Sequence, residues 1–409
     1  MIKVWYVHAY AGSPSHGMSY RPYYLSKNFR EHDVDTTIIS SSYHHLSSIT
    51  GIGQQVIDDQ DFYFVPVNRY SGNGFKRISN MLAFGIKLFG SGFRSFAYSN
   101  KPDVIIASTA HPFHIFAAKF YAKLFKAKLI LEVRDIWPMS LNELAGLSKL
   151  HPFSILVNIC QKFGYKYCDE CVSLLENSEK FFLSQGLEAG KFTYIPNGIE
   201  LSEHSSINNE LVEKLKESLS GFSKVIGYTG ALGLPNNLMP LIESATYLKD
   251  FNIAILLVGD GVEKTNLMKK VDELGINNVV FFGKVPKKDI HTIIDYCDAM
   301  FINALPKNIY KYGISPNKIF DYMLENKVVF NGIESKGNPL EKSRSEIRFP
   351  SNDAYTLAEK IIEFSTESFP SEIKSELFVR NNYSYKVLAR RYVSLIHRLV
   401  YEKNSSDRC

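Results

Sequence analysis

Short apolar runs alternate with longer amphipathic segments throughout the first half of the chain. The apolar runs have the length and composition of β-strands, and in order they are IKVWYVHAY, DTTIISS, DFYFVPV, DVIIAST, KLILEVRD, CVSLL and FTYIPN. Segments long enough to form helices lie between most of them. This alternation predicts a parallel, doubly wound β-sheet with flanking helices.

The same alternation restarts after the polar, turn-rich segment YIPNGIELSEHSSINNE. The later strand-like runs are KVIGYTGA, IAILLVGDG, VVFFGKV, AMFINAL and KVVFNGI. We therefore predict two α/β domains, residues 1–200 and 201–383. Residues 384–409 are long enough to return to the first domain as a helix, and their apolar positions have helical spacing: Tyr385, Leu388, Tyr392, Leu395 and Leu399.

Composition agrees with two domains and limits the partners. The 409 residues, 45% of them apolar, are too many for one core and enough for two. The sequence contains no block of five or more like charges, which argues against binding to nucleic acid. The net charge of +5 suits an anionic ligand or an anionic membrane surface. Cys168 and Cys171 form a C-x-x-C, but no second pair completes a zinc site, so no metal centre is predicted.

Features of the whole chain indicate where the protein acts. Five cysteines in a chain of this length are typical of a reducing compartment. Met1 leads directly into a strand pattern without the features of a signal peptide, and no apolar run is long enough to span a bilayer. These patterns predict a cytoplasmic protein.

The loops that follow strands are the expected ligand sites, because open α/β sheets bind ligands outside the carboxyl ends of their strands. With two such sheets, we predict an active site in a cleft between the domains. The first loop, AGSPSHGMSYRP, has Gly12 and Gly17 but not the G-x-G-x-x-G fingerprint, which argues against hydride transfer. The first loop of the second domain has Gly230 and Gly233, for which simple turn formation is an equal alternative.

Lys318 and Asp321 lie three residues apart near the start of a predicted helix, in GISPNKIFDYMLENKVVF. Residues at this spacing share a helical face, so both can act on one ligand. The cation would bind a phosphate, and the carboxylate would accept two ribose hydroxyls. An ordinary ion pair at a helix start remains an equal alternative.

Polar residues also end two strands of the first domain. His111 and His114 follow DVIIAST, where a histidine can contact a sugar hydroxyl or move a proton. Arg134 and Asp135 end KLILEVRD, and Asp135 could orient an acceptor hydroxyl or hold Arg134 in place. Structural roles, a helix start for the histidines and an ion pair for Arg134 and Asp135, stay open.

Residues 75–98 have the pattern of an amphipathic helix. At about 100° per residue, the basic residues Lys76, Lys87 and Arg94 align on one side. The apolar residues of the other side are Phe75, Ile78, Leu82, Phe89 and Phe96. Such a helix suits an anionic membrane surface, although an ordinary helix on a domain surface has the same pattern.

Seven motifs together resemble bacterial glycosyltransferases of family 4, which have the GT-B fold: HGMSYR, EVRDIWP, YIPNGIE, YTGALGLPNNL, LVGDGVEK, FFGKVPKKDI and SPNKIFDYML. Within that family, the chain resembles the O-antigen, capsule and colanic acid subgroup that contains N-acetylfucosamine transferases. The resemblance implies a retaining, metal-independent and cofactor-free transfer of a sugar from a nucleotide diphosphate donor, with uridine as the base. It also implies a polyprenyl-diphosphate-linked saccharide acceptor at the inner face of the cytoplasmic membrane.

The residue patterns and the resemblance together predict roles for individual residues. The catalytic set is His111, Arg134, Asp135 and Lys318. The donor-binding set is Gly17, Arg21, Gly230, Gly259, Lys284, Val285, Pro316, Asn317, Lys318 and Asp321. The acceptor or membrane side has His114, Lys76, Lys87 and Arg94.

The chain departs from the family pattern around the donor pyrophosphate. Asp321 takes the position of the second acid of the family's E-x7-E motif, but Gly313 stands in place of the first acid. The usual cation pair is also missing from ALGLPNN. We expect Lys318 to replace the lost charge, with Lys311 or Arg344 behind it.

Two other functions remain as alternatives. A nucleotide-sugar 2-epimerase shares the two-domain α/β plan but acts without an acceptor. A non-catalytic nucleotide-binding partner subunit is the second alternative, because Gly313 replaces an acid. Product analysis without acceptor identifies the first, and nucleotide binding without turnover identifies the second.

Overall fold

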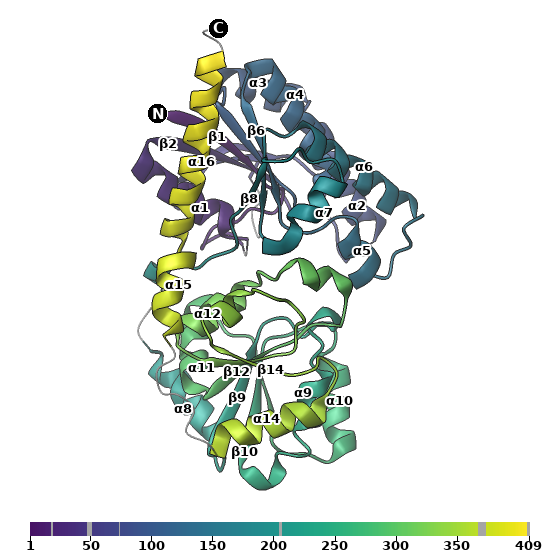
Figure 1. The fold of residues 1–409 in the computed structure, drawn as a ribbon, viewed down its shortest axis with the longest axis vertical. Helices are drawn as coiled ribbons and strands as arrows, with labels where there is room; N and C mark the ends of the chain where they lie inside the picture. Colours follow the sequence, from purple (N-terminus) through teal and green to yellow (C-terminus); the bar gives the residue numbers. More distant parts are fainter. Residues whose placement is uncertain (18, 47–50, 73, 204–206, 367–373, 407–409) are drawn as a thin grey trace. The chain divides into compact units, whose positions relative to one another are not determined.

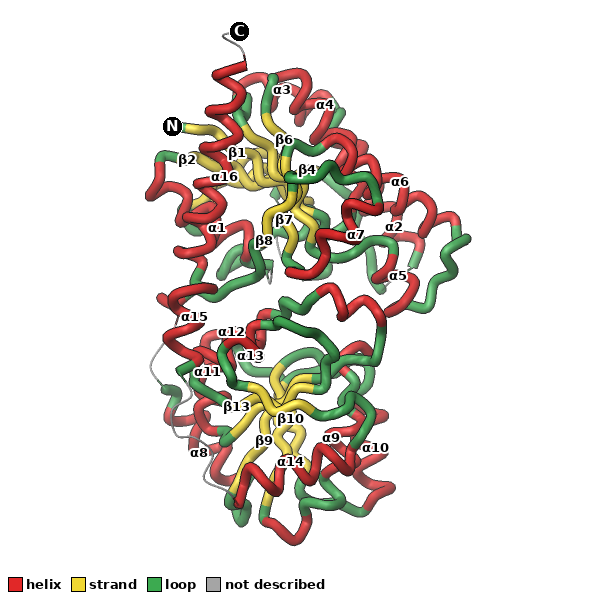
Figure 2. The backbone as a smooth tube through the Cα atoms, in the orientation of Figure 1, coloured by secondary structure: helices red, strands yellow, loops and turns green. Residues whose placement is uncertain are grey.

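A computed structural model describes residues 1–17, 19–46, 51–72, 74–203, 207–366 and 374–406. The chain forms two compact units, Met1–Gly198 with Tyr385–Cys409, and Ile199–Ser384 (Figure 1). Each unit contains one β-sheet with helices on both sides, as the tube in Figure 2 shows. The predicted α/β class with two doubly wound sheets is confirmed.

The sheet of the first unit has the strand order β3-β4-β2-β1-β5-β6-β7-β8. All neighbouring strands are parallel except β3 and β4. The order reverses between β1 and β5, which places a topological switch point at the carboxyl ends of these two strands. The strands are β1 (Ile2–Val7), β2 (Val34–Ser41), β3 (Gly53–Ile57), β4 (Gln60–Val65), β5 (Val104–Ser108), β6 (Lys128–Val133), β7 (Glu170–Ser173) and β8 (Phe192–Tyr194).

The edge strand β3 was not predicted from the sequence. Its segment GQQVI has only one buried residue, so it lacks the apolar run that marks the central strands. β3 pairs with β4 through a turn in which Asp58 and Asp59 both have positive φ, the geometry of a tight two-residue hairpin.

Helices cover both faces of the first sheet. The last helix of the chain, α16, packs against α1: Tyr385 stacks on Tyr24 with ring centroids 5.1 Å apart, and Tyr392 lies 5.8 Å from Phe29. The C-terminal helix therefore belongs to the first unit, although residues 407–409 of the predicted segment lie outside the described residues. The helices are α1 (Arg21–Phe29), α2 (Phe75–Lys87), α3 (Ser91–Ser99), α4 (Ile115–Phe125), α5 (Met139–Leu144), α6 (Pro152–Tyr167), α7 (Glu179–Ser184) and α16 (Tyr385–Ser406).

The predicted continuous helix over residues 75–98 is wrong, because the structure divides it into α2 and α3. The amides of Phe89 and Gly90 bond back to the carbonyls of Ile86 and Lys87, and the chain turns there. Gly90 then starts α3 with an extended backbone. Arg94 is thus on a different helix from Lys76 and Lys87, and the predicted alignment of the three cations does not hold.

The sheet of the second unit is entirely parallel and has the order β11-β10-β9-β12-β13-β14. This is the 3-2-1-4-5-6 order of a dinucleotide-binding type of fold, with its switch point between β9 and β12. The strands are β9 (Lys224–Thr229), β10 (Ile253–Val258), β11 (Val279–Gly283), β12 (Ala299–Ile302), β13 (Val328–Asn331) and β14 (Glu346–Arg348). The helices are α8 (Asn209–Ser218), α9 (Met239–Ser244), α10 (Lys264–Leu274), α11 (Ile290–Tyr296), α12 (Asn317–Leu324), α13 (Pro339–Lys342), α14 (Ala354–Thr366) and α15 (Ser375–Tyr383).

Within the described residues, no helix has both the length and the apolar character required to cross a membrane.

Candidate active site

Lys318 lies at the start of α12, and its ammonium group reaches the carboxyl end of β9. Its Nζ donates a hydrogen bond to the Tyr228 hydroxyl at 2.8 Å and lies 4.0 Å from the centroid of the Tyr228 ring. Burial lowers the pKa of Lys318 to about 7. Among the described residues it has no carboxylate partner, which leaves this cation available to an anionic ligand.

Glycines form the backbone surface beside the Lys318 ammonium. Gly230 has φ of 133°, and a Cβ there would lie 2.9 Å from Lys318 Nζ. A Cβ on Gly259 would lie 1.8 Å from the Gly230 carbonyl oxygen, and one on Gly261 would lie 2.2 Å from that of Leu232. The loops after β9 and β10 therefore contact each other through backbone alone, and side chains are excluded there.

Asp321 lies one turn further along α12 and does not pair with Lys318. Its Oδ1 accepts a hydrogen bond from Lys287 Nζ at 2.6 Å, and the carboxylate is mostly buried. The two residues that the sequence placed on one helical face thus have separate partners. A ligand hydroxyl that binds Asp321 would share or displace the Lys287 contact.

The other predicted donor residues of the second unit surround these loops. Pro316 is the cap of α12, and Asn317 is its first, exposed residue. Lys284 is exposed and pairs with Asp260 at 3.2 Å. Val285 packs against the core, so its side chain is structural.

The two residues expected behind Lys318 are not joined to it. Lys311 lies 5.1 Å from the centroid of its neighbour Tyr312. Arg344 has positive φ just after α13 and donates its amide to the Glu341 carbonyl. Within the described part of the chain, neither side chain forms a hydrogen bond or ion pair with Lys318 or Asp321.

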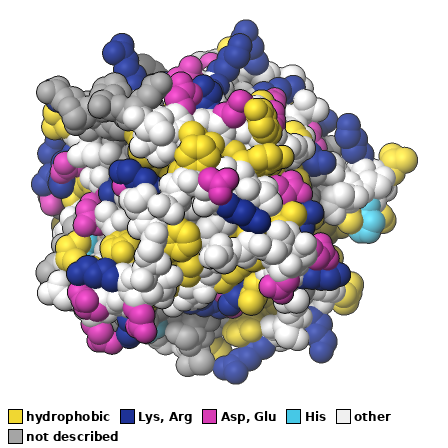
Figure 3. All heavy atoms as spheres, turned by 90° about the horizontal axis from the view of Figure 1, so that it is seen from below, with side chains coloured by type: hydrophobic (Ala, Val, Ile, Leu, Met, Phe, Trp, Pro, Cys, Tyr) yellow, Lys and Arg dark blue, Asp and Glu magenta, His cyan; other side chains and the backbone are white. Residues whose placement is uncertain are grey.

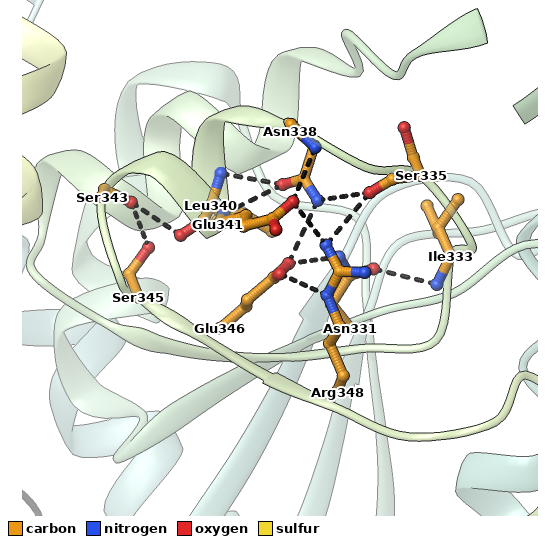
Figure 4. Close-up of polar contacts among 11 residues, drawn as sticks. Asn331, Ile333, Ser335, Asn338, Leu340, Glu341, Ser343, Ser345, Glu346 and Arg348 are labelled. Carbon is orange, nitrogen blue, oxygen red and sulfur yellow. Dashed lines mark hydrogen bonds and ion pairs between the residues drawn. The ribbon is translucent and has the colours of Figure 1, made fainter. Parts of the chain in front are cut away.

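A second polar group, at the ends of β13 and β14, is internally satisfied (Figure 4). Glu346 accepts hydrogen bonds from Asn331 at 2.7 Å and Asn338 at 3.2 Å, and it pairs with Arg348 at 2.5 Å. Arg348 also donates to Glu341 at 2.8 Å. This network fixes the loop that contains α13, and its arginine is already neutralised.

In the first unit, four buried histidines gather beyond the ends of β1, β2 and β5: His8, His44, His111 and His114. Tyr10 lies between them, with ring centroids 5.5 Å from His44 and 5.6 Å from His111. Neither ring nitrogen of His111 has a hydrogen-bond partner in the described structure. Buried polar groups usually have a hydrogen-bond partner, so unpartnered ring nitrogens suggest that a ligand supplies one. Their position at the switch point of the sheet is also typical of a ligand site.

Burial keeps these histidines neutral. Desolvation lowers the pKa of His114 to about 3 and that of His44 to about 4, and it holds the pKa of His8 and His111 well below the usual range. The charge of nearby Arg134 lowers the pKa of His8 further. Neutral imidazoles can donate to or accept from sugar hydroxyls.

These pKa values predict loss of stability in acid. Each imidazole binds a proton near pH 6.5 in the unfolded chain but only at much lower pH in the folded unit. The stability is therefore complete above about pH 6.5 and falls as the pH decreases, by about 1.4 kcal/mol per pH unit for each histidine until its folded pKa is reached. We expect the urea midpoint to fall between pH 7 and pH 5. Both tryptophans, Trp5 and Trp137, lie in the first unit, so their fluorescence reports on it.

His114→Phe should have a weaker pH dependence than the parent over that range. His151→Phe is the control, because His151 is exposed. An equal pH dependence of stability in the parent and His114→Phe would contradict the conclusion that burial lowers the pKa of His114.

Arg134 and Asp135 follow β6, as predicted, but they differ in exposure. Arg134 is half-buried, and its Nη1 atom has no hydrogen-bond partner among the described residues. Asp135 keeps exposed surface, but desolvation still raises the pKa of its carboxyl, and the charge of Arg134 opposes that rise. Trp137 ties this loop to the end of β5, because its Nε1 donates to the Thr109 carbonyl at 3.3 Å.

Glu132 is the buried residue of the motif EVRDIWP that sequence reasoning missed. Its carboxylate accepts from Tyr6 at 2.8 Å, Ser108 at 2.7 Å, Tyr392 at 2.8 Å and Arg21 Nε at 3.0 Å. Burial opposes its ionisation, but the charges of Arg21 and Arg134 and the hydrogen bonds from Ser108 and Tyr392 together outweigh that effect and lower the pKa of Glu132. The signal was a lone acid inside an otherwise apolar strand.

Arg21 was predicted to bind the donor, but the structure places it inside the first unit. Its guanidinium pairs with Glu132 and donates to the carbonyls of Ile195 and Pro196. The Arg21 side chain has almost no exposed surface. Its contacts are those of a structural residue. Gly17 lies earlier in the same loop with φ of 139°, and a Cβ on Gly12 would lie 2.8 Å from its carbonyl carbon.

The residues predicted for the acceptor or membrane side separate into two groups. His114 belongs to the buried histidine group, whereas Lys76, Lys87 and Arg94 are exposed on α2 and α3. The described residues contain no cluster of three or more His, Cys, Asp or Glu side chains that could hold a metal ion.

Two family descriptions match the chain. Residues 16–203 match "Glycosyltransferase Family 4", and residues 213–307 match "Glycosyl transferases group 1". Together with the two doubly wound units, these matches define a glycosyltransferase of the GT-B fold. Over residues 16–203 the chain is therefore similar to glycosyltransferase family 4.

A curated relative matches part of the chain. The putative colanic acid biosynthesis glycosyl transferase WcaI of Escherichia coli (strain K12) is 26% identical over 186 residues. The match covers 44% of this chain and 46% of WcaI, so it spans about half the length of that relative.

Solved structures share the fold over nearly the whole chain. Sucrose-phosphate synthase from Thermosynechococcus elongatus has a TM-score of 0.77 at 11% identity, over 98% of this chain and 100% of that chain. HepE of Anabaena in complex with UDP and glucose has a TM-score of 0.66 at 14% identity, over 97% and 100%. WaaG, a glycosyltransferase involved in lipopolysaccharide biosynthesis, has a TM-score of 0.67 at 11% identity, over 97% and 99%.

Proposed function

We propose that this protein transfers a sugar from a UDP-linked donor to a lipid-linked saccharide during the synthesis of a surface polysaccharide such as O-antigen or capsule. The observation that carries the proposal is Lys318, a cation that has no carboxylate partner in the described part of the chain and lies beside the backbone of glycines at the switch point of the second unit. The UDP complex of HepE supports the choice of base. The names of WcaI and WaaG support the choice of pathway.

The donor diphosphate is proposed to lie against the backbone of Gly230 and beside Lys318. Only glycine lets the chain approach a pyrophosphate so closely, and an ammonium at this point neutralises charge that builds on the leaving group. Asp321 then accepts hydrogen bonds from the ribose hydroxyls, which displace the Lys287 ammonium from the carboxylate. In this arrangement Lys318 does the work of the absent cation pair, and no metal ion is needed.

The proposed reaction retains the anomeric configuration. The bond between the anomeric carbon and the diphosphate oxygen breaks, and the acceptor oxygen bonds to that carbon on the same face. The acceptor proton passes to the leaving phosphate, so the reaction is balanced without a protein nucleophile. His111, with two unpartnered ring nitrogens, is the proposed contact for a sugar hydroxyl on the first unit. An N-acetylated deoxyamino sugar is one candidate for the transferred group.

A thermal-shift panel of UDP, GDP and UDP-sugars tests the donor site. A ligand that binds only the folded state raises the melting temperature, so UDP should stabilise the parent protein. Asp321→Ala should lose most of that shift because the ribose hydroxyls lose their acceptor. Lys287→Ala is the matched control: it breaks the same 2.6 Å ion pair but keeps the carboxylate, and should retain the shift.

Two results would contradict the proposal. An equal loss of the thermal shift in both variants would mean that the ion pair matters only for structure. A thermal shift with GDP alone would contradict uridine as the base of the donor. The two alternatives are separated by products: a 2-epimerase converts its nucleotide sugar without any acceptor, and a non-catalytic partner binds UDP without turnover.

A further inference from the structure

The outward sides of three neighbouring helices in the first unit carry large exposed apolar side chains. On α4 they recur every four residues, on α6 they lie on one side of the helix, and two more lie at the end of α2 and just after it. Helix α4 packs against both α2 and α6 (Figure 1). We call this area the apolar surface, and it consists of Ile86, Phe89, Phe116, Phe120, Leu124, Ile155, Leu156 and Ile159.

Ring contacts make the apolar surface continuous. Phe89, just after α2, lies 5.5 Å from Phe120 of α4. Phe116 of α4 lies 4.6 Å from Phe163 of α6, which in turn lies 4.7 Å from Tyr167. Large continuous apolar areas are rare on surfaces that face only water, so this one is expected to be covered.

Helix α4 differs from an ordinary surface helix. Its inward side is apolar, with Ile115, Ala118 and Tyr121 buried, and its outward side carries Phe116 and Phe120. Lysines supply all of its charge. A helix that is apolar on both sides normally lies in an apolar environment on both sides.

The charges on these helices and on α3 all have one sign. Helices α2, α3, α4 and α6 contain eight Lys or Arg residues and no Asp or Glu. Lys123 and Lys162 are exposed beside the apolar surface, and in the described structure neither has a carboxylate partner. On α10 of the second unit, by contrast, Lys269 pairs with Glu273, and the face in Figure 3 shows basic and acidic side chains intermixed.

We infer that the apolar surface docks on an anionic lipid bilayer. Its aromatic and aliphatic side chains enter the boundary between headgroups and acyl chains, and the surrounding lysines contact anionic headgroups. The inference replaces the single helix over residues 75–98 with a wider surface, most of it on α4 and α6. A second copy of the chain fits less well, because a two-fold symmetric contact would bring the same cations face to face.

Vesicle co-sedimentation tests this inference. The parent protein should pellet with phosphatidylglycerol-containing vesicles and much less with neutral phosphatidylcholine vesicles. Phe116→Ser/Phe120→Ser should lose binding through lost insertion. Lys123→Glu/Lys162→Glu should bind at least about 30-fold more weakly, because the loss of the two lysines alone costs about 1 kcal/mol per charge. The matched control is Tyr247→Ser/Tyr355→Ser, an exposed aromatic pair in the second unit.

Several results would overturn the inference. One is a parent protein that does not pellet with anionic vesicles, and another is equal binding by parent and surface variants. A dimer that Phe116→Ser/Phe120→Ser dissociates, without vesicle binding, would assign the surface to self-association. If the phenylalanine variant fails to fold, the lysine variant alone decides. The UDP thermal shift is measured on every variant, so failure here is distinct from failure of the proposed donor site.

Discussion

Replacing Lys318 with methionine lowers the transfer rate about 10²- to 10³-fold, the usual cost of removing one preorganised group that stabilises a leaving charge. The physical reason is that, among the described residues, no second unpaired cation contacts the Lys318 ammonium: Lys284 pairs with Asp260, and Arg348 pairs with Glu346 and Glu341. The measurement is release of UDP together with formation of the glycosylated acceptor.

Lys327→Met is the matched control for this variant. Lys327 follows the opposite end of α12, and its Nζ donates to the Asp295 carbonyl at 2.9 Å, away from the glycine loops. The control should keep the parent rate. A Lys318→Met enzyme with near-parent turnover would remove Lys318 from the mechanism.

The affinity for UDP should depend on pH, because the charge of Lys318 does. Because burial lowers the pKa of this ammonium to about 7, the free enzyme loses the charge as the pH rises through 7. UDP binding should therefore weaken above about pH 7, by up to tenfold per pH unit. Lys318→Met should bind UDP weakly and without that dependence. Equal pH profiles in the parent and the variant would show that Lys318 does not sense the diphosphate.

Replacing Arg21 with methionine destabilises the first unit by about 3–5 kcal/mol, the usual cost of leaving one buried charge without its partner. Arg21 donates to the Glu132 carboxylate and to two backbone carbonyls, and all of these acceptors lie inside the protein. Urea unfolding followed by tryptophan fluorescence measures the change, since both tryptophans lie in this unit. Under the rejected donor-binding role, the same variant would be as stable as the parent and would lose UDP affinity.

Lys386→Ala is the control for Arg21→Met. Lys386 pairs with Glu31 at 3.2 Å, also between α16 and the first part of the chain, but both side chains are half exposed. Exposed pairs contribute about 0–1 kcal/mol. A loss for Arg21→Met no larger than that of the control would show that the buried pair is not central to stability.

The central strands could be predicted from the sequence because they are buried on both faces and therefore apolar throughout. β3 and β14 could not be predicted in this way, since each lies at a sheet edge and is only partly buried. The break between α2 and α3 was also missed. Helical periodicity continues across Gly90, and only tertiary packing shows that the chain turns there.

Some residues of the candidate site were predicted from the sequence, but the side chains that they contact were not. Lys318 and Asp321 were found from spacing, yet their partners, Tyr228 and Lys287, lie 90 and 34 residues away along the chain. Arg21 was assigned to the wrong role for the same reason: its partner Glu132 is 111 residues distant and looked like part of a strand. Long-range contacts of this kind leave no local pattern.

The position of α16 has a consequence for how the protein is made. Tyr392 completes the set of donors around Glu132, and the helix covers the core beside α1. When residues 1–198 have been synthesised, α16 has not, so the first unit is still incomplete. The second unit, whose residues are continuous in the chain, can finish first, and the unit that begins synthesis completes its fold only when the last helix emerges.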